Sequence, residues 1–366
     1  METKVRNEGI DLLRIVAMFF VMILLTLGQG GLLGSFAGNY VNMRAVWALN
    51  IIALPAVNIF AMISGYVGYT ETPKPFRVSK YFSLWLMVFT YGLILTIVQA
   101  IVTEGGVSGS DVAASFFPVT SNHFWYFTAY TGLFLLMPVI NAMIRMYSPE
   151  RLKKILLVVL IVFSAYDFWT DRFIPGYTLT MMWLAVMYFI GAVIKKCDIG
   201  ANLRSRHLAI IIALCTFFTW IWKLTIPEFN ILGITVSGDT VTKNSAPAVV
   251  IAAMAYLILF SRIRFKKGKD TQSFVRFCAP AVFASYIVSC HPLIWFNILS
   301  GRFSYLCQRN SFEMIGTVLI FSALLMGAAI LVEQGRLTLF KLIKVKQGLE
   351  WAEDKLRAAV FKHEKQ

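Results

Sequence analysis

Titratable side chains inside long apolar stretches are the residues of this sequence best suited to chemistry. Asp11 and Arg14 are three residues apart in the first stretch, so a helix would place them on one face, where they can pair. His291 stands in the ninth stretch, and an imidazole exchanges its proton near neutral pH. Such groups are costly at membrane depth and usually functional. Two plainer interpretations stay open: Asp11 and Arg14 extend to lipid headgroups, and His291 is a buried, hydrogen-bonded residue beside a proline kink.

Aromatic residues surround a further histidine at the start of the fourth stretch, which reads Ser121-Asn122-His123-Phe124-Trp125-Tyr126. The run falls at a predicted outer interface of the membrane, where Trp and Tyr form belts. A belt explains the aromatic side chains, while the histidine is a candidate for an acceptor site.

The stretches that must position these residues are themselves the strongest signal in the chain. Hydrophobic residues make up 58% of the sequence and charged residues 14%, and about 20 apolar residues suffice to cross a bilayer. We therefore expect an all-α integral membrane protein with about ten transmembrane helices, since backbone groups in lipid must be bonded within the segment. The expected spans are Gly9–Gly28, Arg44–Tyr66, Tyr81–Val102, His123–Ile144, Ile155–Trp169, Tyr177–Ile194, His207–Ile226, Ala246–Phe260, Ala279–Leu299 and Phe312–Val332.

The distribution of basic residues orients these spans. The chain holds 34 Lys and Arg against 19 Asp and Glu, and most of the basic residues fall on one set of loops and on the C-terminal segment. Lys and Arg are enriched on the cytoplasmic side, so both termini are expected to be cytoplasmic in a multi-pass protein of the cytoplasmic membrane. The charge is then explained by topology and by anionic lipid, and we expect no nucleic acid as a partner.

Two regions are expected along the chain. Residues 1–335 form the transmembrane domain, and residues 336–366 form a basic amphipathic helix on the cytoplasmic membrane surface, because apolar residues recur there at helical spacing. The five cysteines have no metal-binding spacing, so no metal site is predicted.

Several short motifs, taken in order, resemble the membrane-bound acyltransferase-3 family. Each motif is weak alone, but their order extends from Arg6 to about Val332. They are Arg6-Asn7 with Ile10-Asp11-Leu12-Leu13-Arg14, Ser64-Gly65-Tyr66, Arg77 with Lys80, the Ser121–Tyr126 run, Ile174-Pro175-Gly176-Tyr177, and Ser285-Tyr286 with His291-Pro292-Leu293.

The resemblance implies transfer of an acyl group, usually acetyl, from cytoplasmic acyl-CoA to a hydroxyl of an extracytoplasmic glycan or lipid-linked sugar. It implies no tightly bound cofactor, because acyl-CoA is a substrate. Arg77 and Lys80 would hold the phosphates of acyl-CoA. Arg14, set by Asp11, would stabilise the thioester or its oxyanion, and His123 and Tyr126 would lie on the acceptor side.

One position departs from the family pattern. Members typically carry a histidine ten intervening residues after the first-span arginine, and here that position is Leu25. The histidine would be the general base, and leucine cannot accept a proton. Three interpretations stay open: an engineered substitution, a natural member that binds without catalysing, or a replacement base, for which His291 is the better placed.

Two other functions remain possible from the sequence. A transporter or flippase of envelope precursors would also have many spans and basic inner loops, although no internal repeat or pair of broken helices supports it here. A non-catalytic membrane scaffold of the same family would explain Leu25.

Overall fold

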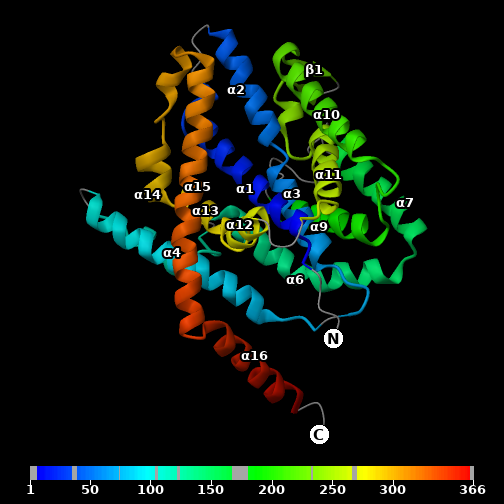
Figure 1. The fold of residues 1–366 in the computed structure, drawn as a ribbon, viewed down its shortest axis with the longest axis vertical. Helices are drawn as coiled ribbons and strands as arrows, with labels where there is room; N and C mark the ends of the chain where they lie inside the picture. Colours follow the sequence, from blue (N-terminus) through cyan, green and yellow to red (C-terminus); the bar gives the residue numbers. More distant parts are fainter. Residues whose placement is uncertain are drawn as a thin grey trace.

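The computed structural model describes residues 6–34, 39–73, 75–103, 106–121, 124–166, 180–231, 234–265 and 270–362. Helices dominate this part of the chain, and the strands are two short ones (Figure 1). The elements are α1 (Glu8–Gly28), α2 (Tyr40–Ala53), α3 (Ala56–Gly68), α4 (Val78–Val102), α5 (Gly109–Phe116), α6 (Trp125–Met146), α7 (Pro149–Leu160), η1 (Ile161–Tyr166), α9 (Met181–Lys196), α10 (Ser205–Thr225), β1 (Phe229–Ile231), β2 (Ile234–Val236), η2 (Thr240–Thr242), α11 (Pro247–Ser261), α12 (Asp270–Cys278), α13 (Val282–Cys290), α14 (Pro292–Ile294), η3 (Trp295–Leu299), η4 (Ser304–Gln308), α15 (Ser311–Leu342) and α16 (Val345–Lys362).

The all-α membrane fold is confirmed. Among the described residues, seven helices are long and apolar enough to cross a membrane, and an eighth is added if α12 and α13, bent by 43°, count as one span. The expected count of about ten is therefore approximate. The fifth and sixth spans extend into residues 167–179, outside the described residues.

Two of the expected spans differ from a simple helix for physical reasons. The helix α9 has 16 residues, and every side chain from Trp183 to Ile194 is buried in the protein, so it is an interior helix rather than a lipid-facing one. The ninth span breaks between α13 and α14 at His291-Pro292, because proline has no N–H to continue the hydrogen-bond ladder.

Close contact between α3 and α9 forms the centre of the core. A Cβ atom added at Gly65 would lie 1.9 Å from the carbonyl oxygen of Tyr188, and one added at Gly191 would lie 2.0 Å from that of Met62. Small residues thus let the two backbones touch. On α1, Gly9 similarly permits contact with the backbone of Phe260 in α11.

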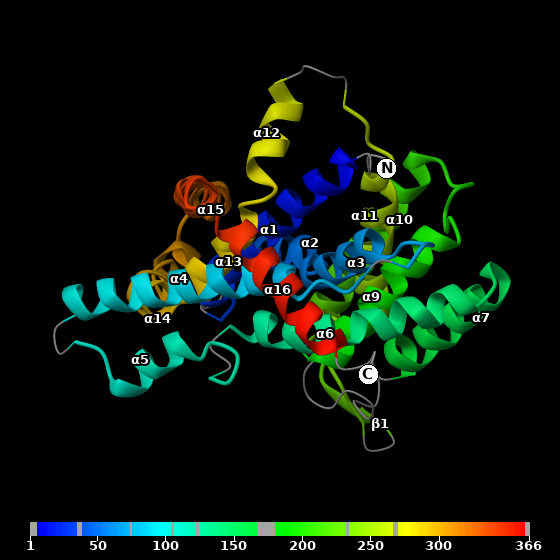
Figure 2. The ribbon, with the colours of Figure 1, turned by 90° about the horizontal axis from the view of Figure 1, so that it is seen from below.

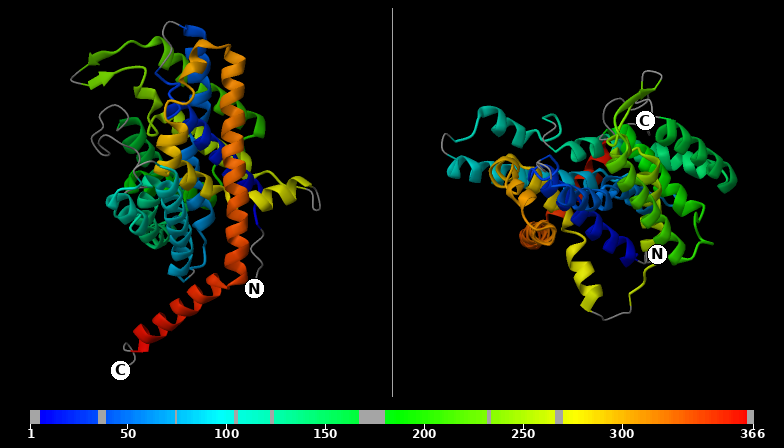
Figure 3. Two further views of the ribbon diagram at one scale, coloured as in Figure 1. Left: turned by 90° about the vertical axis from the view of Figure 1, so that its left-hand side faces the viewer. Right: turned by 90° about the horizontal axis from the view of Figure 1, so that it is seen from above.

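The C-terminal part of the chain is a long helix followed by a shorter one at an angle (Figure 3). The helix α15 continues through the expected domain boundary at residue 335 and ends at Leu342. From there α16 passes across α4 when the molecule is seen from below (Figure 2). In Figure 1 the start of α1 is its lower end, and α16 lies lower still; that this side is cytoplasmic remains a prediction from charge.

Candidate functional site

A cavity of about 520 Å³ opens beside Arg14 of α1, between the end of α3 and the start of α4, and extends along α6 from Tyr130 to Arg145. This is the end of the helices that the charge pattern assigns to the inner side of the membrane. Besides apolar side chains, the polar residues that line it are Arg14, Ser64, Thr70, Arg77, Lys80, Tyr81, Tyr130, Asn141, Arg145 and Tyr188.

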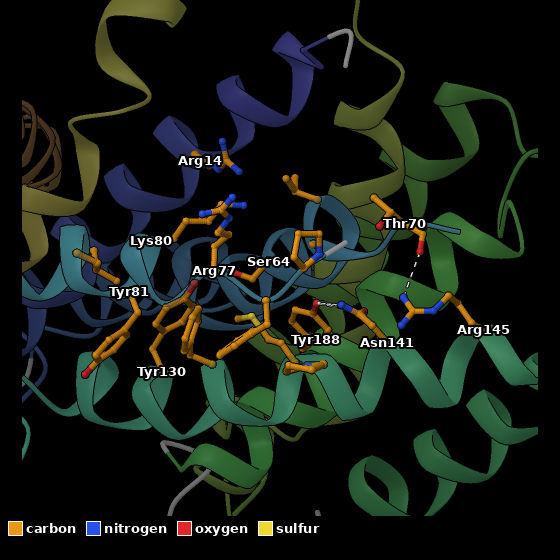
Figure 4. Close-up of a pocket in the computed structure, with 18 residues that line it drawn as sticks. Arg14, Ser64, Thr70, Arg77, Lys80, Tyr81, Tyr130, Asn141, Arg145 and Tyr188 are labelled. Atoms are coloured by element: carbon orange, nitrogen blue, oxygen red, sulfur yellow. Dashed lines mark hydrogen bonds between the residues drawn. The ribbon is translucent and has the colours of Figure 1, made fainter. Parts of the chain in front are cut away.

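Four cations from three helices and their ends meet in this cavity. Figure 4 shows Arg14, Arg77 and Lys80 grouped on one side and Arg145 on the other. The guanidinium of Arg145 donates to the carbonyl oxygen of Thr70 at 3.3 Å. In the sequence Arg145 is one of several inner-side charges, and nothing marks it as a site residue. Its place in the cavity becomes apparent only when α6 packs against α9. The cavity can therefore attract a polyanion such as a pyrophosphate.

A buried carboxylate fixes the position of Arg14. Asp11 Oδ1 accepts from Arg14 Nη1 at 2.6 Å, its other oxygen accepts from Arg6, and its side chain is 4% exposed. The pair that the three-residue spacing predicts is therefore present. A guanidinium has five N–H groups, so Arg14 can bind Asp11 and still donate into the cavity that it lines.

The start of α4, which carries Arg77 and Lys80, is held by the C-terminal helix. Glu353 accepts from the backbone N–H groups of Val78 at 3.0 Å and of Ser79 at 3.1 Å. The first N–H groups of a helix have no partner within it, so Glu353 caps α4 from another helix. Next to it, Asp354 pairs with Arg77 at 2.6 Å.

The environment of Glu353 favours its ionised form. Desolvation acts to raise its pKa, but the hydrogen bonds from Ser79 and Val78 and the nearby Arg357 outweigh it and lower the pKa to about 2. The helix N-terminus adds favourable charge. Glu353 is thus an anion at neutral pH, as its capping contact requires.

Aromatic rings continue from the cavity along α6. Tyr130 lines the cavity, and its ring lies stacked 6.5 Å from that of Tyr126, one turn earlier. The Tyr126 ring also packs against Phe60, Phe283 and Tyr286, and the residue is buried. Neighbouring rings therefore cover Tyr126, and its place on the acceptor side stays a prediction. His123 lies outside the described residues.

The segment that carries His291 lies beside the part of α1 that carries Leu25. Ser289 Oγ contacts Met22 Sδ at 3.3 Å, and Gln29 Nε2 donates to the carbonyl oxygen of Trp295 at 3.2 Å. These contacts place the segment of His291 beside the turn of α1 that carries Leu25. Leu25 is half-buried and packs against the core, and neither Leu25 nor His291 lines the cavity of Arg14.

The imidazole of His291 is used in structural hydrogen bonds. Its Nδ1 accepts from the N–H of Leu293 at 3.2 Å, so in the neutral ring the proton is on Nε2, which lies 3.1 Å from Thr96 Oγ1. Thr96 in turn bonds Ser115 at 2.6 Å. The ring therefore caps α14 and joins it to α4 and α5, and in this state neither nitrogen offers a lone pair to a hydroxyl.

The comparisons with known proteins agree with this arrangement. A family model described as an acyltransferase domain, that of the acyltransferase-3 family, matches residues 7–333, nearly the whole chain. No curated protein and no solved structure matches this chain. The match includes α1 with Asp11 and Arg14, the start of α4, and α13–α14 with His291, and the chain therefore belongs to the acyltransferase-3 family.

Proposed function

We propose that this membrane acyltransferase binds acyl-CoA, with acetyl as the group transferred, from the cytoplasmic side and serves a hydroxyl of an extracytoplasmic glycan or lipid-linked sugar. The observation that carries the proposal is the meeting of Arg14, Arg77, Lys80 and Arg145 in one cavity of about 520 Å³. That volume lies within the roughly 300–1,000 Å³ of small-molecule sites. No tightly bound cofactor is needed, since acyl-CoA brings the activated group.

The positions of the cations in the cavity suggest which part of acyl-CoA each would bind. Arg77 and Lys80 lie on the first turn of α4 and its cap, where the phosphates of acyl-CoA would enter. Lys80 is exposed and supplies a point charge without the fork of a guanidinium. Arg14, held by Asp11, lies on a different helix and would receive the thioester end.

The chemistry requires one proton to move. The hydroxyl oxygen of the acceptor bonds to the acyl carbon, the C–S bond breaks, and the proton lost by the hydroxyl finally resides on the CoA sulfur. Arg14 would stabilise the negative charge that develops on the carbonyl oxygen. A base must first take the proton, and the position that supplies it in the family is Leu25 here.

We therefore favour a site that keeps donor binding and lacks its base. The contacts of His291 support this over a relocated base, because its ring is committed to Leu293 and Thr96. If the missing base abolishes transfer completely, the chain is a non-catalytic family member that only binds acyl-CoA.

Donor binding is tested with the purified full chain and acetyl-CoA in isothermal titration. Binding is expected, and the double variant Arg77→Ala with Lys80→Ala should weaken it and reduce its dependence on salt. The matched control replaces Lys153 and Lys154, two exposed inner-side lysines of α7, with alanine and should bind normally. If acetyl-CoA does not bind the folded unmodified chain, the proposal fails, and a transporter or scaffold role takes its place.

A further inference from the structure

A second cavity, of about 430 Å³, lies at the elbow between α15 and α16, where both meet α4. Its cationic lining residues are Arg336, Lys341, Lys344 and Lys346, and its apolar walls include Leu86 and Phe340. It shares no lining residue with the cavity of Arg14.

The cations of this elbow cavity are not all compensated. Arg336 pairs with the buried Glu333 at 2.6 Å, and Lys346 lies 3.8 Å from Glu350. Within the part of the chain that the structure describes, neither Lys341 nor Lys344 has a carboxylate at ion-pair distance. Two positive charges thus remain for an anion from outside the chain.

The surroundings of the elbow are those of a membrane interface. The helix α15 is long and apolar enough to span a membrane, and Leu339, Leu342 and Ile343 at its end are exposed apolar side chains. On α16, Trp351 is exposed with Lys355 over its ring at 4.2 Å, a pairing suited to the headgroup region. An anion that reaches this cavity by the membrane would bring apolar chains with it.

Lys344 occupies a backbone position where glycine would cost less. Its φ is +56°, and its N–H bonds the carbonyl oxygen of Lys341 at 3.2 Å, as at a helix end closed by a left-handed residue. A lysine in this left-handed conformation has a higher conformational free energy than glycine would have. Its side chain nevertheless lines the cavity, which gives the residue a role that glycine could not fill.

We propose that the elbow cavity binds the phosphate of an anionic phospholipid, with Lys341 and Lys344 as its principal contacts. The acyl chains of the lipid would lie along the apolar side chains of α4 and α15. The lipid would thereby fix the angle at which α16 leaves α15 and crosses α4. This site is separate from the donor site and does not depend on the proposed acyl transfer.

The test is native mass spectrometry of the purified full chain titrated with phosphatidylglycerol or phosphatidylcholine of the same acyl chains. One phosphatidylglycerol should bind more tightly than any phosphatidylcholine. Lys341→Ala and Lys344→Gly should each weaken it about fivefold. Lys344→Gly keeps the backbone conformation available, so it removes the ammonium without threatening the fold. Lys154→Ala, which removes an equal charge from exposed α7, should have no effect.

Three outcomes would overturn the assignment. Equal affinity for the two lipids would show that the headgroup charge is not recognised. Unchanged phosphatidylglycerol binding in both lysine variants would place the lipid elsewhere. If glycerol 3-phosphate in water displaced the lipid at similar concentrations, the ligand would be a soluble phosphate, and the lipid assignment would be wrong.

Discussion

Asp354 of the C-terminal helix forms a 2.6 Å ion pair with Arg77, one of the two residues that we assign to the phosphates of acyl-CoA. Both side chains are partly exposed, at 61% and 37%, and such pairs contribute at most about 1 kcal/mol. A phosphate group carries more charge than the carboxylate and can displace it. The pair would therefore compete only weakly with the proposed donor, while Glu353 beside it holds α4 in place.

Neutralising Asp354 should strengthen donor binding. We expect Asp354→Asn to lower the Kd for acetyl-CoA by up to about fivefold at low salt, the equivalent of a pair of about 1 kcal/mol. Isothermal titration at low and high salt measures this, and the gain should shrink with salt. Glu350→Gln, on the same helix but away from the donor cavity, is the control. A weaker affinity in Asp354→Asn would mean that the carboxylate organises the site.

The contact of α16 with α4 should depend on pH through Glu353. Its folded pKa of about 2 lies below its ordinary value of 4.5, so the contact is stabilising above pH 4.5 and is lost as the pH falls toward 2. Spin labels at two exposed positions, Thr72 in the segment before α4 and Ala358 on α16, report the distance between these segments. The distribution of distances between the two labels should broaden as the pH falls from 4.5 to 2. Glu353→Gln should show the broad distribution already at pH 7; a narrow one there would contradict the capping role.

Filling the α3–α9 contact should destabilise the fold. In Gly191→Ala the new Cβ would lie 2.0 Å from the carbonyl oxygen of Met62, and backbone must shift to admit it. We expect a loss of about 1–3 kcal/mol, seen as a lower midpoint of thermal unfolding. Gly327→Ala in α15, where a Cβ meets nothing within 4 Å, is the matched control and should be neutral or slightly stabilising. Equal midpoints for the two variants would refute the close contact.

Replacing His291 should affect stability rather than donor binding. His291→Ala leaves the N–H of Leu293 without its partner and should cost about 1–3 kcal/mol. Asparagine at this position retains a hydrogen-bonding group, so His291→Asn should lose less stability than His291→Ala. The Kd for acetyl-CoA should stay unchanged in both, because His291 does not line the donor cavity. Loss of activity without loss of stability would instead identify His291 as the base.

The sequence predicts those features of the fold and the site that depend on local spacing. A spacing of three residues brings Asp11 and Arg14 together on one helix face, and apolar runs of about 20 residues mark the spans. The rest depends on contacts between distant segments. Nothing near Arg145 indicates that it shares a cavity with Arg14, and nothing near Glu353 indicates that it caps a helix 275 residues earlier. The interior position of α9 likewise results from how the helices pack.

We propose above all that this chain binds its donor but lacks the base at position 25. Arg14 and Leu25 are eleven residues apart on α1, roughly 16 Å along its axis, so a histidine there would lie deeper than the thioester end. A positioned base contributes about 10²–10⁴-fold to a rate.

The most direct measurement compares the unmodified chain with Leu25→His in inside-out bacterial membrane vesicles supplied with radiolabelled acetyl-CoA. Leu25→Asn, which adds a polar group that cannot act as a base, is the matched control. Leu25→His should raise acetyl incorporation into enclosed glycans by about 10²–10⁴-fold without changing the Kd for acetyl-CoA. If the unmodified chain already transfers acetyl groups as fast as Leu25→His, the account of a missing base is wrong.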